Sequence, residues 1–174
     1  MEQPRRVKIR SGSRQEQLLK YEHLVEVNDT TDPLIPDLTR EEVWFGLLCR
    51  AEDPRPFLPG LESCEILARQ DNALDRRLHF GQAVIDDQVI FEAMSWIRFE
   101  SRATADHAGG TLTIAIEEPA EGALFLRFTY ATTLAEGGTG SEGRYAEFVK
   151  SAYRESDIDT VRVIRMIAES SRLQ

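Results

Sequence analysis

A glycine-rich stretch gives the clearest cofactor-like pattern in the chain. Gly138 to Gly143 read GTGSEG and fit GxGxxG. The stretch follows an expected strand and opens an expected helix, as a dinucleotide-binding turn does. The parallel strand that should follow that helix is missing, and so is its terminal acidic residue. We therefore interpret the stretch as a flexible strand-to-helix linker and expect no cofactor.

The histidines are His23, His79 and His107, and none has the HxH or HExxH spacing of a zinc site. No metal site is expected. His23 lies in an expected strand and has two interpretations. It is either a polar group of a binding cavity or a strand histidine without a function, and the second is favoured.

Nucleophilic residues give no recognisable catalytic pattern. There is no GxSxG elbow, and neither Cys49 nor Cys64 lies in a CxxC. Both cysteines suit a reducing compartment as small apolar residues; a disulfide between them is the alternative, which sequence alone does not decide. Adjacent carboxylates at 86–87 and 117–118 point to opposite faces of a strand, so neither pair can share a proton. No catalytic residue is predicted.

The elements that must position these residues follow from hydrophobic periodicity. Thr39 and Glu42 form a capping box, and the helix they open ends before Pro54. A short helical turn is expected from Pro54 to Leu58, and one long amphipathic helix over 142–170. The predicted buried face of the long helix, which Ser156 and Thr160 interrupt, consists of Tyr145, Val149, Ala152, Tyr153, Val163, Ile164 and Ile167. A period of two predicts strands at 20–28, 61–69, 74–80, 83–92, 96–103, 110–118 and 123–133.

Short connections between the last six strands indicate antiparallel pairing. The order strand, helix, short helix, six strands and long helix predicts an α+β class, with a curved seven-stranded antiparallel sheet around the C-terminal helix. One domain is expected over 20–170, after a basic extension at 1–19. A strongly bent sheet cannot contact one helix along its whole inner face, so a cavity is expected.

The cavity should be lined by the inward face of the strands and the buried face of the helix. Arg76 is an arginine on an apolar face, and it binds either an acidic group of a ligand or a protein carboxylate, the second being favoured. Ser156 and Thr160 either bond to carbonyls four residues earlier or line the cavity. The predicted lining residues are His23, Trp44, Cys64, Ile66, Arg76, Leu78, Phe99, Ile114, Phe128, Tyr130, Val149, Tyr153, Ser156 and Thr160.

Charge and hydropathy exclude several classes of function. The net charge is −9, and residues 1–20 alone carry six Lys/Arg and two Asp/Glu, so the rest is strongly acidic. Such a surface repels phosphate backbones, and no nucleic-acid partner is expected. No apolar run approaches the roughly 20 residues needed to span a bilayer. The N-terminal stretch has no apolar signal segment, so a cytoplasmic location without membrane contact is predicted.

Six stretches resemble a known family: YEHLVEVND (21–29), DPLIPDLTREEVWFGL (32–47), RAEDPRPFLPGLESCEIL (50–67), TLTIAIEEP (111–119), GALFLRFTY (122–130) and YAEFVKSAYRESDIDTVRVIR (145–165). They are similar to the AtaL-like family of the START-like (SRPBCC) superfamily. That resemblance implies the helix-grip fold, with two short helices after the first strand, and a small-molecule cavity. It implies no activity.

The leading functional hypothesis is binding of a small hydrophobic or aromatic molecule between sheet and helix. The alternative is an enzyme of the polyketide cyclase or dehydratase type, in which Arg76, Tyr130 or His23 polarises a carbonyl or moves a proton. A third class, an interaction module without a ligand, is left open. So is a homodimer, for which no sequence feature argues.

Overall fold

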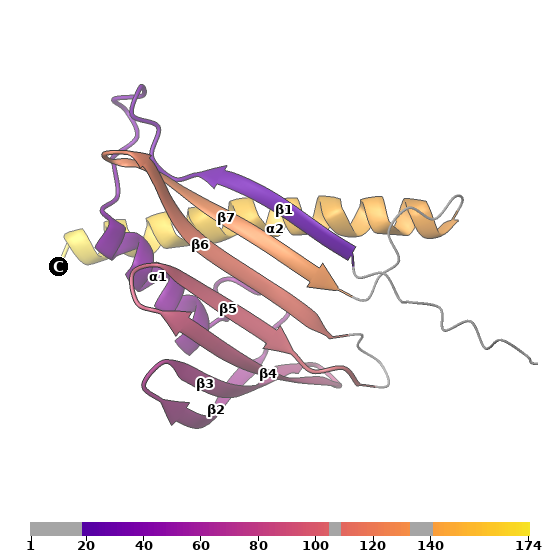
Figure 1. The fold of residues 1–174 in the computed structure, drawn as a ribbon. Coiled ribbons are helices and arrows are strands. Elements are labelled where there is room, and N and C mark those ends of the chain that lie inside the picture. Colours follow the sequence, from indigo (N-terminus) through magenta and orange to yellow (C-terminus); the bar gives the residue numbers. More distant parts are fainter. Residues whose placement is uncertain (1–18, 105–108, 133–140) are drawn as a thin grey trace, which may run out of the picture.

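The computed structural model describes residues 19–104, 109–132 and 141–174 (Figure 1). The predicted α+β class is confirmed, because a single seven-stranded sheet packs with two helices. The elements in chain order are β1 (Leu19–Glu26), α1 (Arg40–Glu52), β2 (Ser63–Gln70), β3 (Ala73–Phe80), β4 (Ala83–Glu92), β5 (Trp96–Ser101), β6 (Gly110–Ala120), β7 (Ala123–Thr132) and α2 (Ser141–Arg172).

Every predicted strand is present, with bounds that differ from the predicted ones by at most two residues. Three predictions fall on residues outside the described ranges: the extension at 1–18, His107, and residues 138–140 of the glycine-rich stretch. Neither described helix is long and apolar enough to cross a membrane.

The sheet has the strand order β1-β7-β6-β5-β4-β3-β2, and every neighbouring pair is antiparallel. Figure 1 shows β1 beside β7, so the start of the domain pairs with its last strand. The other neighbours are consecutive in sequence and are joined by short turns, as hairpin chemistry requires. The predicted curved sheet is therefore confirmed.

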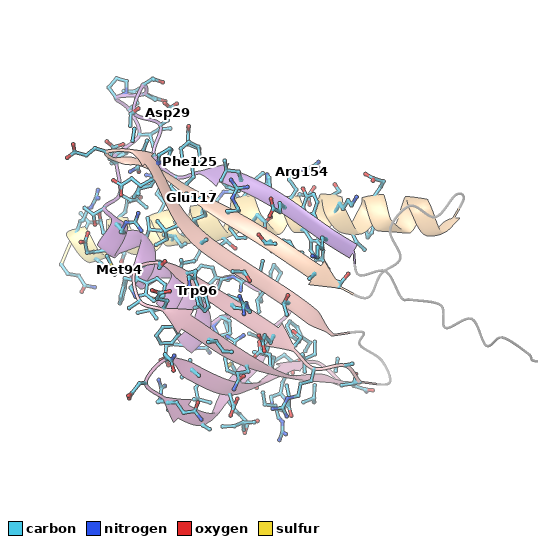
Figure 2. All side chains as sticks on the ribbon, in the orientation of Figure 1. Asp29, Met94, Trp96, Glu117, Phe125 and Arg154 are labelled. Carbon is cyan, nitrogen blue, oxygen red and sulfur yellow. The ribbon has the colours of Figure 1, made fainter. Side chains whose placement is uncertain are left out.

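Strand alternation places one set of side chains on the inner face of the sheet. In β6 the buried residues are Leu112, Ile114 and Ile116, with partly exposed residues between them. Glu117 lies on the outer face, where its carboxylate accepts from Arg127 at 2.9 Å. Figure 2 shows the side chains along both faces of the sheet. The inward parity predicted for β3, β5, β6 and β7 is the buried one.

The predicted capping box opens α1. The amide of Glu42 donates to the Thr39 hydroxyl at 3.1 Å, and the amide of Thr39 donates to the Glu42 carboxylate at 3.0 Å. Two unpaired helix donors are satisfied in this way. After the helix, the amides of Phe57 and Leu58 both donate to the carbonyl of Pro54. The expected short helical segment is thus a single turn with helical hydrogen bonding.

The C-terminal half of α2 is fastened to α1 and to the loop after β1. A Cβ atom at Gly46 would lie 2.7 Å from two carbons of Ile164, so glycine permits the close approach of the helices. Arg172 donates to both Glu42 carboxylate oxygens, at 2.8 and 2.6 Å. Arg165 donates to the carbonyls of Val27 and Pro36. Side-chain contacts at this end therefore fix the position of the long helix.

The buried face of α2 matches the predicted one in part. Thr160 and Ile164 were placed on that face and are buried, whereas Ala152 was placed there and is exposed. Among the described residues of the helix, Asp157, Thr160, Val161, Ile164 and Ala168 are buried. The apolar pattern missed Asp157 because a count of hydrophobic residues assigns an aspartate to solvent.

Candidate functional site

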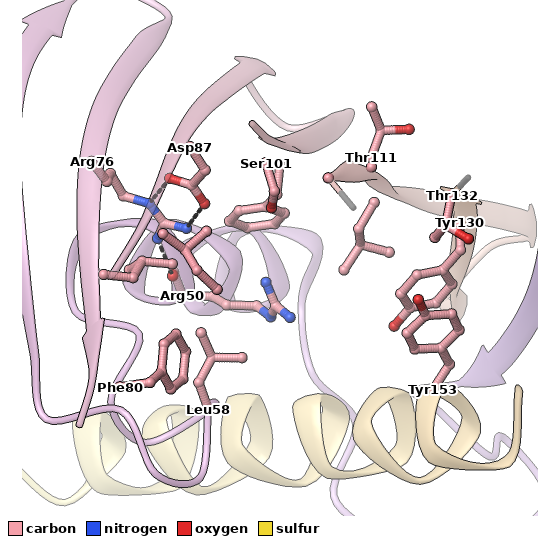
Figure 3. Close-up of a pocket in the computed structure, with 16 residues that line it drawn as sticks. Arg50, Leu58, Arg76, Phe80, Asp87, Ser101, Thr111, Tyr130, Thr132 and Tyr153 are labelled. Carbon is pink, nitrogen blue, oxygen red and sulfur yellow. Dashed lines mark hydrogen bonds and ion pairs between the residues drawn. The ribbon is translucent and has the colours of Figure 1, made fainter. Parts of the chain in front are cut away.

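A pocket of about 230 Å³ lies between the inner face of the sheet, the loop after α1 and the helix α2 (Figure 3). Its apolar walls include Leu58, Leu78, Phe80, Ile85 and Leu112. An apolar cavity of about 150 Å³ already accommodates benzene. The pocket is therefore large enough for a molecule of one or two rings.

The structure brings part of the predicted lining together and leaves the rest elsewhere. Arg76, Leu78, Phe99, Tyr130 and Tyr153 line the pocket. The others lie outside its described wall; these are His23, Trp44, Cys64, Ile66, Ile114, Phe128, Val149, Ser156 and Thr160.

The residues outside the pocket have other contacts. Ile114 and Phe128 are fully buried in the core, although they share the inward parity of the lining. Trp44 packs its ring edge against Phe91, with centroids 5.8 Å apart. The Thr160 hydroxyl donates to the carbonyl of Ser156 at 3.0 Å, which is the back-bonding alternative. The alternation of residues along a strand predicts which side chains point inward, but it does not show which of them pack in the core and which line the pocket.

Arg76 pairs with a protein carboxylate, as the favoured interpretation held. Its Nε and Nη2 donate to the two oxygens of Asp87 at 2.8 and 2.5 Å, and its Nη1 donates to the carbonyl of Ala51 at 2.9 Å. Both side chains are almost completely buried. This bidentate pair also satisfies a carbonyl at the end of α1. Four of the five N–H donors of Arg76 are thus engaged by the protein itself.

Arg50 is the exceptional charge of the pocket. Only 5% of the residue is exposed, and its guanidinium makes no hydrogen bond or ion pair with another residue of the described ranges; its Nε is fully buried and unpaired. Its Cζ lies 4.5 Å from the ring centroid of Phe99, a contact that offsets part of the desolvation cost. Burial lowers the pKa of this guanidinium from its ordinary value, but arginine stays charged in proteins.

A second polar group joins the sheet to α2. The Tyr130 hydroxyl donates to Oδ1 of Asp157 at 2.5 Å, and Nδ1 of His23 lies 3.1 Å from Oδ2. Burial raises the pKa of the Asp157 carboxyl, while the bonds from Tyr130 and His23 oppose that shift. Burial and the neighbouring Asp157 also raise the pKa of Tyr130, so its hydroxyl is protonated.

Aromatic stacking fixes Tyr130 in the wall of the pocket. Its ring lies parallel to the ring of Tyr153 from α2, with centroids 3.9 Å apart and a 5° angle between planes. Figure 3 shows the two rings on the side of the pocket opposite the Arg76–Asp87 pair. The helix thereby closes the pocket with an aromatic side chain.

Sequence reasoning missed Arg50, Asp87 and Asp157 as site residues. Arg50 lies in the last turn of α1, where a cation is favourable and therefore unremarkable. Asp157 follows Tyr153 by four residues and precedes Val161 by four, so its helical position placed it on a buried stripe. This four-residue spacing was the sequence signal from which a buried Asp157 could have been predicted. The partner of Asp87 could be assigned only from the register of β3 and β4.

The cysteines and acidic clusters offer no further reactive centre in the described part of the chain. Cys49 and Cys64 are free thiols. Burial raises the pKa of both, so neither is poised as a thiolate. Within the described ranges, no three His, Cys, Asp or Glu side chains gather closely enough to hold a metal ion.

Residues 25–171 match the family of acetylaranotin biosynthesis cluster protein L, abbreviated AtaL. The chain belongs to the AtaL family. The resemblance drawn from the sequence is therefore confirmed. Among curated proteins there is no significant match.

Solved structures share the fold of this AtaL family member at low identity. The Zhui aromatase/cyclase from a Streptomyces species has a TM-score of 0.61 at 16% identity, over 91% of this chain and 97% of that one. Human STARD10 has a TM-score of 0.61 at 9% identity, over 94% and 70%. The di-domain ARO/CYC StfQ from the steffimycin pathway has a TM-score of 0.65 at 11% identity, over 92% and 54%. The predicted helix-grip fold is thus confirmed.

Proposed function

We propose that this AtaL family member binds a small, mostly apolar or aromatic molecule in the pocket between the sheet and α2. The observation that carries the proposal is the pocket itself, which combines apolar walls with a few buried polar groups, Arg50 and Tyr130 among them. Binding sites for small molecules have this composition. We also propose a cytoplasmic location, which the free thiols of Cys49 and Cys64 support.

Native mass spectrometry and thermal unfolding test this function together. The protein as isolated should carry a noncovalent adduct, or should be stabilised by members of a set of one- and two-ring aromatic compounds. A ligand at 100 times its Kd adds about 2.7 kcal/mol to the free energy of unfolding. A protein without an adduct that no member of the set stabilises would contradict the proposal.

A second candidate is a cyclase or dehydratase acting in the same pocket. It is supported by the chain of contacts from His23, whose side chain is 19% exposed, through Asp157 to Tyr130 in the pocket wall. Such a chain can carry a proton between solvent and a bound molecule. Arg50, beside it, can polarise a carbonyl oxygen.

Turnover of a model diketone tests the second candidate. The enzyme should accelerate the intramolecular aldol condensation of 2,6-heptanedione, which forms one C–C bond and loses one water to give 3-methylcyclohex-2-enone, followed by NMR. Tyr130→Phe should abolish the acceleration, whereas Tyr21→Phe removes a phenol hydroxyl bonded to Arg154 outside the pocket wall and should not. Equal rates with and without protein would argue for binding alone.

A further inference from the structure

Among the residues that the structure describes, Arg50 has no direct partner for its charge. Two carboxylates act on it electrostatically, Asp157 and Asp87. Asp87 already accepts two hydrogen bonds from Arg76. Asp157 already accepts from Tyr130 and contacts His23. A buried charge is costly unless it is paired, and a bound molecule with a negative charge would supply the partner that Arg50 lacks.

The position of Arg50 shows where that partner would lie. Arg50 extends from the end of α1 into the space between the Arg76–Asp87 pair and the stacked rings of Tyr130 and Tyr153 (Figure 3). The edge of its guanidinium that is not covered by Phe99 therefore faces the interior of the pocket. A planar guanidinium presents two parallel N–H groups, which match the two oxygens of a carboxylate.

We propose that Arg50 binds the carboxylate of a monoanionic ligand whose apolar, ring-bearing part fills the rest of the pocket. This inference rests on the proposed binding function. One cation requires one negative charge, which favours a carboxylate over a phosphate ester with its charge near −2. Leu78, Phe80 and Leu112 provide the apolar walls for the remainder of the molecule. The ligand class is thus a small aromatic carboxylic acid.

The test compares 2-naphthoate with its neutral analogue 2-naphthamide by isothermal titration calorimetry. Wild-type protein should bind 2-naphthoate at least tenfold more tightly than the amide. In Arg50→Met the ratio of the two affinities should fall to about one. Arg55→Met is the matched control, because Arg55 is exposed and pairs with Asp53 outside the pocket wall. It should keep the wild-type ratio.

Thermal unfolding separates a binding role of Arg50 from a structural one. Without ligand, Arg50→Met should unfold at the same temperature as wild type or higher, because it removes an unpaired buried cation. Addition of 2-naphthoate should raise the unfolding temperature of wild type more than that of Arg50→Met. A lower unfolding temperature of the variant, combined with an unchanged affinity ratio, would assign Arg50 to packing on Phe99 and overturn the inference.

The remaining outcomes each decide between the two proposals. Equal affinity of wild type for the acid and the amide overturns the carboxylate inference and leaves the binding function standing. Binding of neither probe, with no adduct in the isolated protein, removes both. If Arg50→Met does not fold, Arg50→Lys decides alone. Lysine lacks the planar fork, so the acid-to-amide ratio should fall at least threefold, and an unchanged ratio overturns the inference.

Discussion

Four charged residues are buried in the described part of the chain: Arg50, Arg76, Asp87 and Asp157. Arg76 and Asp87 pair with each other. Of the other two, Arg50 has no direct partner among the described residues, whereas Asp157 has two, Tyr130 and His23. Burial nevertheless outweighs these bonds and raises the pKa of the Asp157 carboxyl. A carboxyl whose pKa is higher in the folded than in the unfolded chain binds its proton more tightly when folded. It therefore destabilises the fold as pH rises through its folded pKa.

Asp157→Asn should change the pH dependence of stability in a defined direction. Asn keeps an oxygen that accepts from Tyr130 and carries no charge at any pH. The free energy of unfolding of the variant, relative to wild type, should be higher at pH 7 than at pH 4, since wild type recovers stability as Asp157 is protonated. Urea unfolding at several pH values measures this difference.

Asp159→Asn is the matched control for the loss of one carboxylate from α2, because Asp159 is half-exposed and pairs with Arg162. The difference in free energy of unfolding between Asp159→Asn and wild type measures the effect of the change in net charge. A relative stability of Asp157→Asn that rises towards pH 4 would contradict the assignment of Asp157 as a carboxyl that burial destabilises.

The pairing of strands β3 and β4 places one Arg–Asp ion pair on each face of the sheet. Asp86 and Asp87 are adjacent and point to opposite faces, as the sequence predicted. Asp87 joins Arg76 on the inner face, and Asp86 joins Arg77 on the outer face at 2.8 Å. The inner pair also holds the end of α1 through carbonyl contacts. It is thus a structural element of the pocket wall.

Asp87→Ala should therefore cost much more stability than Asp86→Ala. Loss of Asp87 leaves Arg76 buried and unpaired, which typically costs about 3–5 kcal/mol. Loss of Asp86 breaks a pair that water screens, so a far smaller loss is expected. Guanidinium unfolding of the two variants measures the contrast. Similar losses would show that the inner pair does not support the fold.

Most of the helices and strands could be predicted from the sequence because the patterns that indicate them are local. Period-two alternation and the capping box at Thr39 depend only on neighbouring residues, and both were confirmed. The buried face of α2 and the missing partner of Arg50 depend on contacts between distant segments. No periodicity reports such contacts, and so Ala152 was misplaced and Arg50 overlooked.

The whole molecule is arranged so that its long helix is fixed at one end and lines a pocket nearer the other. Gly46, Arg165 and Arg172 hold the C-terminal half of α2 against α1 and the β1 loop. Tyr153, more than ten residues earlier in the same helix, faces the pocket. A space between a bent sheet and a straight helix follows from this geometry, because the two surfaces separate away from their tightest contact.

Filling that space should remove binding without removing the fold. Leu112→Trp adds an indole to the pocket wall, and overpacking typically costs about 1–3 kcal/mol. Affinity for 2-naphthoate should fall at least tenfold, while circular dichroism retains the wild-type spectrum. Leu67→Trp makes the same change at a half-exposed position on the edge strand β2 and should bind as wild type does. Undiminished affinity in Leu112→Trp would place the ligand elsewhere, for example in the hollow between the loop after α1 and α2 that Pro56 and Arg162 line.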